Sequence, residues 1–344
     1  MAEEFEHLTE PKVKSALILV PHQDDEINIA GCLIPQMVKN DVVVKVWFVT
    51  NGDYEGKQEI RAKEAVKAAK VLGISRIIYL GYGDGGLQGG SLYHAKDFDE
   101  VIVSPSGHSE TYGTKEFNDF HFEEYGSHAS YTKNNLLQDI KSVLLKNHAD
   151  LLFCIDEDFH PDHKLVSELF DKALSELIQE TDYRPLVLKK FAYLGIWHGK
   201  DDYFFRPMQP TECVSYGKYA TKSCCPHDWS KRLRFAVPSE IYTLCFWNSP
   251  VFRAIKNYSS QYDAFTAFLR IVNSDAVYWY FETKMQIKDC NDFPIERTPF
   301  LFFKEQKSLN KSNCNKHLLL KYLFFLYWIC FCRIPRKIKK ILGI

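Results

Sequence analysis

The sequence lacks a strong charge of one sign and lacks paired cysteines. In 344 residues the formal net charge is -1, so no global field directs the chain toward nucleic acid, and we expect no nucleic-acid partner. None of the ten cysteines forms a C-x-x-C pair, which argues against a zinc ribbon. The sequence also has no internal repeat and no low-complexity tract.

The sequence also lacks a secretion signal and a complete dinucleotide-binding fingerprint. The acidic, polar segment 1–14 has no apolar core of the kind that a secretion signal carries. Cysteines in apolar runs, such as Cys154, are typical of free thiols, so we expect a reducing, cytoplasmic location. The glycines of Gly81–Gly86 mimic a dinucleotide loop but lack the full fingerprint and a following helix, which argues against a nicotinamide site.

The composition is that of an ordinary folded protein. Hydrophobic residues make up 46% and charged residues 25% of the chain, the usual globular balance. Aromatic residues reach 15%, and most of them follow Phe117. They fit either a bulky core or surfaces that stack against sugars, because aromatic side chains serve both purposes.

Short apolar runs alternate with amphipathic segments over the first 200 residues. The runs predict strands at 15–21, 42–50, 76–80, 151–155 and 187–195. The intervening segments predict helices at 27–39, 57–72, 135–146 and 164–180, with an interior proline at Pro35 and a C-cap at Gly73. This order predicts an α/β fold: a Rossmann-like, mostly parallel sheet with helices on both faces.

We expect three parts along the chain. Residues 1–200 form the catalytic α/β domain, with a long lid or insertion at 81–133, since such irregular stretches are usually functional. Residues 201–305 form an irregular, aromatic-rich C-terminal extension that completes the domain or the substrate pocket, with helices near 249–258 and 264–272. Residues 306–344 form a basic, apolar tail.

The tail permits two interpretations. Its apolar run at 317–332 has about 15 residues and includes Lys321, short of the roughly 20 that span a bilayer. Basic residues follow up to position 340, and such residues favour anionic lipid headgroups. Segment 317–340 therefore predicts either a peripheral contact with the inner face of the membrane or a helix packed on the protein or on a second copy.

The first chemical signal is the segment Pro21–Glu26, at the carboxyl end of the first predicted strand. It places His22 beside the three carboxylates Asp24, Asp25 and Glu26. These carboxylates repel one another unless a cation or a proton intervenes. A divalent metal site resolves the repulsion, although acidic residues also suit a helix N-terminus.

The second signal is Asp156–His163, which follows the strand at 151–155. It again combines histidines with carboxylates at the carboxyl end of a strand. In open α/β sheets ligands bind at that edge, so the two clusters can converge in space. Their joint occurrence favours one metal site over two unrelated polar loops.

These segments resemble the PIG-L, or LmbE-like, de-N-acetylase family. Its signature is A/P-H-P-D-D-E near the amino terminus and H-x-D-H a hundred or more residues later; this chain has HQDDE and HPDH. The resemblance covers about residues 15–200 and extends weakly to Lys256–Gln261. It includes, in order, Thr50–Asp53, Arg61 with Glu64, Leu72-Gly73, and Leu80-Gly81 with Asp84.

The resemblance implies a role for each matching residue. His22, Asp25 and His163 are metal ligands, and the metal is Zn²⁺ or another divalent transition metal, since nitrogen and oxygen ligands admit several. Asp24 is the general base that takes a proton from the attacking water.

The later motif supplies the remaining catalytic residues. His160 stabilises the oxyanion or protonates the leaving amine, and Asp162 holds His160 in its tautomer. Arg61 and Asp84 resemble positions that bind sugar hydroxyls or a phosphate. From the residues alone, Arg61 equally fits an exposed helix position paired with Glu64, and Asp84 equally fits a turn.

The chain departs from the family pattern at two positions. Gln23 replaces the usual proline, which predicts only a loop adjustment. Asp158 stands where some members carry a tyrosine thought to assist the oxyanion, so that role falls to His160 or to a lid tyrosine such as Tyr82 or Tyr93.

The resemblance implies a zinc-dependent deacetylase of the N-acetylglucosaminyl type. Its substrate is an N-acetylated amino sugar on a lipid, a nucleotide or a polysaccharide precursor, and its product is acetate. The alternatives are an amidohydrolase acting on a non-sugar acylated conjugate and a carbohydrate-binding protein without catalysis.

Overall fold

The computed structural model describes residues 13–87, 90–192, 227, 233–238, 240–241, 246–273 and 275–280. It contains one seven-stranded sheet in the order β3-β2-β1-β4-β5-β7-β6. The first five strands in the chain, β1 to β5, are parallel. They are Ser15–Val20, Val43–Thr50, Arg76–Tyr82, Leu151–Ile155 and Leu186–Lys190. The predicted mostly parallel α/β fold is therefore confirmed.

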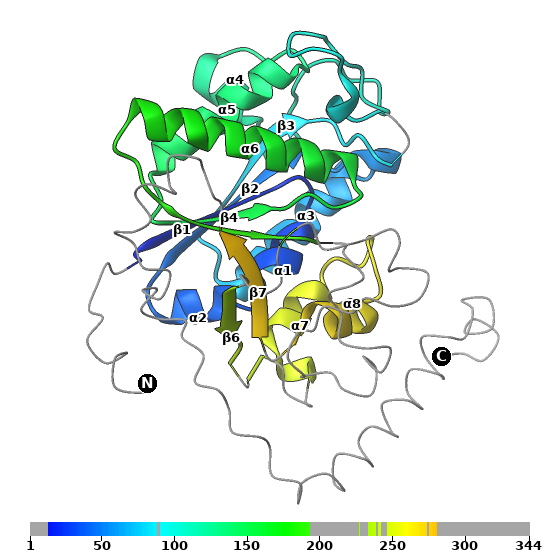
Figure 1. Cartoon of the computed structure of the whole chain (residues 1–344). Coiled ribbons are helices and arrows are strands. Elements are labelled where there is room, and N and C mark those ends of the chain that lie inside the picture. Colours follow the sequence, from blue (N-terminus) through cyan, green and yellow to red (C-terminus); the bar gives the residue numbers. More distant parts are fainter. Residues whose placement is uncertain are drawn as a thin grey trace, which may run out of the picture.

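Helices cover both faces of this sheet (Figure 1). One face carries α4 (Phe120–Tyr125), α5 (Lys133–Asn147) and α6 (Pro161–Glu180). The other carries α1 (Asp25–Ala30), α2 (Ile34–Lys39), α3 (Gln58–Leu72), α7 (Pro250–Ile255) and α8 (Ala264–Ile271). Gly73 ends α3 as predicted, with φ of 77° and its N–H bonded to the Ala69 carbonyl. Two short 3-10 helices, η1 (Tyr54–Gly56) and η2 (Leu92–His94), lie in the loops, and a third, η6 (Phe246–Asn248), precedes α7.

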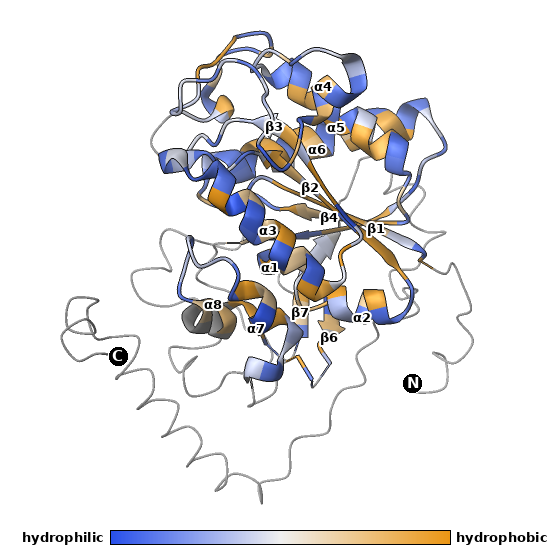
Figure 2. Ribbon diagram, turned by 180° about the vertical axis from the view of Figure 1, so that it is seen from behind, coloured by the Kyte–Doolittle hydropathy of each residue, from blue (hydrophilic) through white to orange (hydrophobic). Residues whose placement is uncertain are grey.

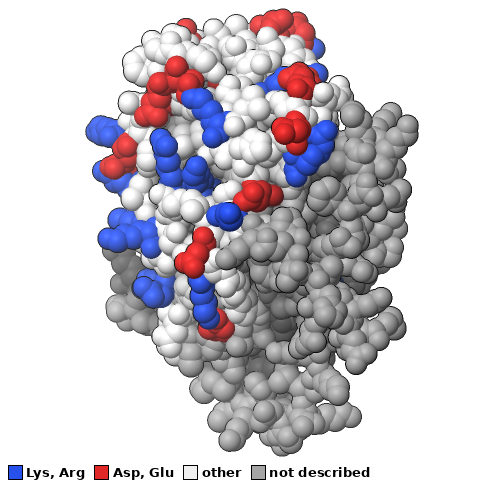
Figure 3. All heavy atoms as spheres, turned by 90° about the vertical axis from the view of Figure 1, so that its left-hand side faces the viewer, with Lys and Arg blue, Asp and Glu red and all other residues white. Residues whose placement is uncertain are grey.

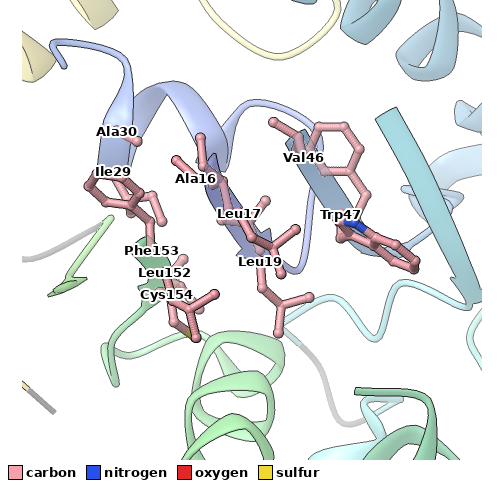
Figure 4. Packing of buried hydrophobic residues seen from close by; sticks show 14 of the residues in the cluster. Ala16, Leu17, Leu19, Ile29, Ala30, Val46, Trp47, Leu152, Phe153 and Cys154 are labelled. Carbon is pink, nitrogen blue, oxygen red and sulfur yellow. The ribbon is translucent and has the colours of Figure 1, made fainter. Parts of the chain in front are cut away.

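Apolar strands make the core between these layers. The strands in the middle of the sheet are coloured mostly as hydrophobic, whereas the helices outside alternate between polar and apolar residues (Figure 2). Ala16 of β1 pairs with Val44 on one side and Leu151 on the other, so β1 is buried among neighbours on both edges. Figure 4 shows Leu17, Phe153 and Cys154 within this packing. Cys154 is a free, buried thiol, as its apolar surroundings predicted.

The prediction of one continuous helix at 27–39 is wrong. Instead of one helix at 27–39, α1 ends at Ala30 and α2 begins at Ile34. Pro35 lies in the first turn of α2, where its missing N–H is tolerated, whereas inside a longer helix it would remove a hydrogen bond. The break leaves α1 as a short helix that carries its acidic residues at the end of β1.

The helix predicted at 164–180 begins earlier than expected. It starts at Pro161, with His160 as its N-cap, so Asp162 and His163 lie in its first turn rather than in a loop. Proline is well suited to this first position because its fixed φ already matches a helix. The second motif is therefore held on a rigid element.

The carboxyl-terminal part of the described chain extends the same sheet. β7 (Asp275–Tyr280) pairs antiparallel with β5, and β6 (Leu233–Ala236) pairs antiparallel with β7. Helix α7 lies against α3, and α8 packs on α7. The segment 81–133 packs beside β3 through α4, and Asp119 bridges to Tyr79.

The described surface carries charges of both signs. On the face shown in Figure 3 lysine and arginine side chains are interspersed with aspartate and glutamate. Among the described residues there is no helix that is both long and apolar enough to cross a membrane. The basic, apolar segment at 317–340 lies outside the described residues.

A substitution at Gly81 tests how tightly the segment 81–133 is packed against β3. Its φ is +88°, and a Cβ built there would lie 2.3 Å from Asp119 Cβ and 2.9 Å from the Tyr112 carbonyl oxygen. Positive φ costs alanine about 1 kcal/mol, and overpacking costs about 1–3 kcal/mol more. We expect Gly81→Ala to lower the free energy of unfolding by about 2–4 kcal/mol, measured by urea denaturation.

Gly107→Ala is the matched control for this substitution. Gly107 has nearly the same φ, +86°, but a Cβ there meets nothing within 4 Å. This variant should lose only the backbone contribution, about 1 kcal/mol. If Gly81→Ala and Gly107→Ala lower the free energy of unfolding equally, the packing at Gly81 is not tight.

Candidate active site

The two chemical clusters meet where the strand order reverses. From β1 the chain passes to β2 and then β3 on one side, while β4 lies on the other side of β1. His22 follows β1 and His163 follows β4, so both lie at the carboxyl edge of the sheet beside this switch point. Crevices at such points are where ligands bind in open α/β sheets. Asp53 and Asp84, which follow β2 and β3, complete the same edge.

The three residues predicted as metal ligands lie together and are buried. Asp25 Oδ2 is 3.2 Å from His22 Nδ1 and 3.3 Å from His163 Nε2. Tetrahedral zinc with ligand distances of about 2.0–2.1 Å separates its donor atoms by about 3.3–3.4 Å. The two distances to Asp25 Oδ2 thus match the separation between neighbouring ligand atoms of zinc.

A carboxylate also fixes the second nitrogen of each imidazole. His22 Nε2 lies 3.1 Å from Asp162 Oδ2, and His163 Nδ1 lies 2.8 Å from Asp158 Oδ2. An ionised carboxylate can only accept, so Asp162 and Asp158 favour a proton on each of these two nitrogens. Of the two neutral tautomers of each ring, the one with its proton on this nitrogen presents a lone pair toward Asp25. Histidines that ligate metals commonly have such carboxylate partners.

The electrostatics of the site also suit a cation. Burial alone would lower the pKa of His163, but Asp25 and Asp158 outweigh it and raise this pKa to about 9. The pKa of His22 is raised in the same way: burial opposes its charge, while Asp84, Asp162 and Asp25 favour it. Burial would raise the pKa of Asp25, but the two imidazoles hold it well below its usual range. The carboxylates therefore attract positive charge to the place where the donor atoms converge.

Two other sets of donor atoms lie close to this place. The side chains of His22, His160 and His163 have ligand atoms within 4.8 Å of one another, and so do those of His22, Asp84 and Asp162. Both sets include His22 and neither includes Asp25. In the part of the chain that the structure describes, the predicted set of His22, Asp25 and His163 is not among the groups whose ligand atoms all lie within 4.8 Å of one another. These buried His and Asp side chains could hold a metal ion, and the sets differ in which carboxylate or imidazole completes the site.

His160 is held differently from the expectation drawn from the sequence. Its Nδ1 accepts a hydrogen bond from the Asp162 backbone N–H at 3.2 Å, as the N-cap of α6. The Asp162 carboxylate instead contacts His22, accepts from Gly85 N at 2.9 Å, and accepts from the Ser91 hydroxyl. Asp162 therefore orients His22 with its carboxylate and His160 with its backbone.

The environment of His160 keeps the ring uncharged. It lies edge-on to His22 at 4.8 Å between ring centroids and stacks on His163 at 4.7 Å. Burial lowers its pKa, and the charges of His22 and His163 lower it further, to about 4. Because Nδ1 accepts the backbone hydrogen bond, the proton of the neutral ring is on Nε2.

Asp24 has an unusual backbone conformation. Its φ is 114°, in the region that favours glycine, and it precedes α1 directly. Its N–H donates to Glu26 Oε2 at 2.9 Å, and Arg61 Nη2 lies 3.9 Å from its Oδ1. Strained backbone of this kind clusters at functional sites.

Arg61 and Asp84 form a buried pair. Arg61 Nη1 lies 3.3 Å from Asp84 Oδ2, and Nη2 donates to the Gln23 carbonyl at 3.2 Å. The alternative of an exposed Arg61 is wrong, because its side chain is buried; Glu64 accepts hydrogen bonds from Ser259 and Ser260. Gln23 donates to the Thr50 carbonyl at 2.9 Å, a bond that proline could not make.

Sequence reasoning missed several contributors to this site. Asp158 was noted only as a departure from the family tyrosine, yet it is the partner of His163. Ser91 gave no signal, because it is one serine in an irregular segment. The contact between Glu26 and Tyr258 joins residues 232 positions apart, and no local pattern reports such a distance.

Comparisons with known proteins point to one family. Residues 17–174 match the sequence model of the PIG-L family, described as GlcNAc-PI de-N-acetylase. No curated protein matches the sequence. The match contains all eight residues that the sequence analysis assigned to the site, since they lie between His22 and His163.

Solved structures resemble this chain at low sequence identity. An N,N'-diacetylchitobiose deacetylase from Pyrococcus horikoshii is 15% identical, covers 81% of this chain and 88% of its own, and has a TM-score of 0.45. The zinc-inhibited form of a teicoplanin deacetylase is 14% identical over 77% and 97%, with a TM-score of 0.45. A conserved protein from Thermus thermophilus is 15% identical over 86% and 100%, with a TM-score of 0.42.

The carboxylate partner of His163 gives a testable consequence. Asp158→Asn keeps the side-chain volume but removes the charge that orients Nδ1–H, so the imidazole is a poorer ligand. Loss of such a partner typically costs about 10–100-fold in metal affinity. We expect zinc affinity to fall by this factor, measured by competition with a chromophoric chelator.

Glu157→Gln makes the same change from carboxylate to amide on the neighbouring residue. Glu157 is exposed and does not contact His163, so its zinc affinity should match the wild type. If Asp158→Asn binds zinc as tightly as Glu157→Gln does, Asp158 does not support the metal site.

Proposed function

We propose that this chain, which belongs to the PIG-L family of deacetylases, is a zinc-dependent hydrolase that removes the acetyl group from an N-acetylated amino sugar. The products are acetate and a free amine. The observation that carries the proposal is the orientation of two buried imidazoles toward one oxygen of Asp25, each with a carboxylate behind it. Such a donor set, with Asp24 beside it, suits hydrolysis of an amide.

His22, Asp25 and His163 are the residues that would hold the zinc. The orphaned Asp25 Oδ1, which is buried and accepts no hydrogen bond among the described residues, supports this choice. Bound zinc supplies Lewis-acid polarisation of the amide and acidifies the attacking water. Three protein ligands leave a position open, as catalytic zinc sites require.

Asp24 and His160 divide the proton transfers. The Asp24 carboxylate takes a proton from the water as its oxygen attacks the acetyl carbon. His160, neutral and protonated on Nε2, donates a hydrogen bond to the oxyanion that forms. The proton held by Asp24 then passes to the leaving nitrogen, so the C–N bond breaks to give acetate and the amine.

Arg61 and Asp84 position the sugar rather than capture a phosphate. The guanidinium of Arg61 already pairs with Asp84 and with the Gln23 carbonyl, which leaves little positive charge for an anion. Asp84, held in place by Arg61, instead offers acceptor oxygens to sugar hydroxyls.

The loops around the site support an apolar group attached to the sugar. Tyr54, Leu87 and Phe159 follow β2, β3 and β4, and all three side chains are exposed at this edge of the sheet. Ligand sites commonly combine apolar side chains with a few polar groups. We therefore propose a sugar that carries a lipid-like aglycone, in agreement with the lipid named in the description of the family.

Acetate release from a panel of compounds tests this function. The panel contains N-acetylglucosaminyl-phosphatidylinositol, octyl and methyl N-acetylglucosaminides, UDP-N-acetylglucosamine and an N-acetylated amino acid. We expect zinc-dependent release of acetate from the sugars. The kcat/KM should be at least about tenfold higher for the octyl than for the methyl N-acetylglucosaminide, since burial of two methylenes of the octyl chain contributes about 1.6 kcal/mol to binding. Acetate release from the N-acetylated amino acid alone would favour the alternative of an amidohydrolase that acts on a non-sugar amide. Tight binding of the sugars without turnover would favour the alternative of a carbohydrate-binding protein.

Asp24→Asn separates the base from the ligands. We expect full zinc content by atomic emission and a kcat lowered by about 10²–10⁴, because only the proton acceptor is lost. Asp41→Asn is the matched control: Asp41 is an exposed aspartate that also has a positive φ, 60°, and its variant should keep its activity. If Asp24→Asn loses zinc and activity together, Asp24 is a ligand and our assignment of the base is wrong.

A further inference from the structure

The backbone of Asp24 is held in place by a side chain that the catalytic scheme does not use. Its carbonyl accepts from Ile27 N at 3.1 Å and Asn28 N at 3.2 Å, as part of the first turn of α1. Its N–H points the other way and donates to Glu26 Oε2. Because φ of Asp24 is 114°, this hydrogen bond opposes the relaxation that a residue with a Cβ would otherwise undergo.

Glu26 is in turn held from the far end of the described chain. Its second oxygen, Oε1, accepts from the Tyr258 hydroxyl at 2.5 Å. Both side chains are buried, Glu26 with 1% and Tyr258 with 0% exposure, so bulk solvent does not reach their oxygens. The two bonds occupy both carboxyl oxygens and leave Glu26 one orientation.

The position of Tyr258 is itself fixed by a second carboxylate. Glu64 of α3 accepts from Ser259 Oγ at 3.1 Å, from Ser260 N at 2.9 Å and from Ser260 Oγ at 2.6 Å. The segment that follows α7 is therefore fastened to α1 through Glu26 and to α3 through Glu64. These are helices that follow β1 and β2 at the edge where the site lies.

We infer that Tyr258 and Glu26 are positioning residues for the Asp24 carboxylate, and that the segment after α7 thereby sets the rate of the chemical step. Neither residue needs to touch the substrate: Tyr258 orients Glu26, Glu26 orients the Asp24 N–H, and the Asp24 backbone directs its carboxylate. The inference rests on the proposed role of Asp24 as the base. Misplacement of a catalytic group by about 1 Å can cost about 10²-fold in rate, so a small loss of orientation has a measurable effect.

Three substitutions separate this role from packing. Tyr258→Phe keeps the ring and removes the hydroxyl that orients Glu26. Glu26→Leu removes both hydrogen bonds at similar volume. Glu26→Gln can keep them, because its oxygen accepts from the Asp24 N–H and its amide donates to the Tyr258 oxygen.

Tyr278→Phe is the matched control. Tyr278 is equally buried, and its hydroxyl donates to the Ile29 carbonyl of α1 at 2.6 Å. The variant loses one buried hydrogen bond to the same helix, but this bond does not reach Asp24. It should match Tyr258→Phe in its loss of thermal stability.

The experiment measures kcat, KM, zinc content, Tm and the hydrogen-exchange rate of the Asp24 amide in the four zinc-loaded variants. For Tyr258→Phe and Glu26→Leu we expect kcat to fall about 10–100-fold with KM and zinc content unchanged, and the Asp24 amide to exchange faster. Glu26→Gln should restore kcat to near the wild type, and Tyr278→Phe should change only Tm. A kcat for Tyr258→Phe within twofold of that for Tyr278→Phe would overturn the inference.

The exchange rate keeps this test independent of the proposed function. If the wild-type protein hydrolyses none of the panel, the proposed function fails, while faster exchange at Asp24 in Tyr258→Phe still supports the positioning. If the wild-type protein is active but the Asp24 amide exchanges equally fast in Tyr258→Phe and Tyr278→Phe, the positioning fails and the function stands.

Discussion

Buried carboxylates of like charge, gathered at one edge of a parallel sheet, are the constraint on which this site depends. Asp25, Asp84 and Asp162 all lie within 3.5 Å of a nitrogen of His22, and Asp158 lies against His163. Such a cluster is unfavourable in a buried place without compensating positive charge. Protonated imidazoles can supply that charge, but so can a divalent cation, which at the same time uses the lone pairs that converge on Asp25.

The topology of the fold explains why this charge is concentrated where it is. Four parallel strands, β1 to β4, end at the same edge, and each of them is followed by at least one carboxylate of the site. Helices α1 and α6 then begin at the site and hold Asp25 and His163 in their first turns. Rigid elements therefore position the donor atoms, and the irregular segment beside β3 contributes Ser91 as a further partner for Asp162.

The sequence predicts the parts of this structure that depend on local patterns. Apolar runs located β1 to β4 to within two residues, and the two polar motifs located the site because each follows such a run. Contacts that depend on distant residues could not be predicted. Strand β7 beside β5, Asp158 behind His163, and Tyr258 behind Glu26 all depend on tertiary packing, which no local period reports. The split between α1 and α2 could have been predicted, since Pro35 was visible and its cost inside a helix is known.

The identity of the metal ligands is the central claim, and the structure of the zinc-loaded protein tests it most directly. Anomalous diffraction at the zinc edge would locate the ion, and X-ray absorption would count its ligands. We expect one ion bound by His22 Nδ1, Asp25 and His163 Nε2, with Asp158 and Asp162 still behind the two rings. An ion bound instead by His22, Asp84 and Asp162, with Asp25 and His163 outside coordinating distance, would contradict this assignment.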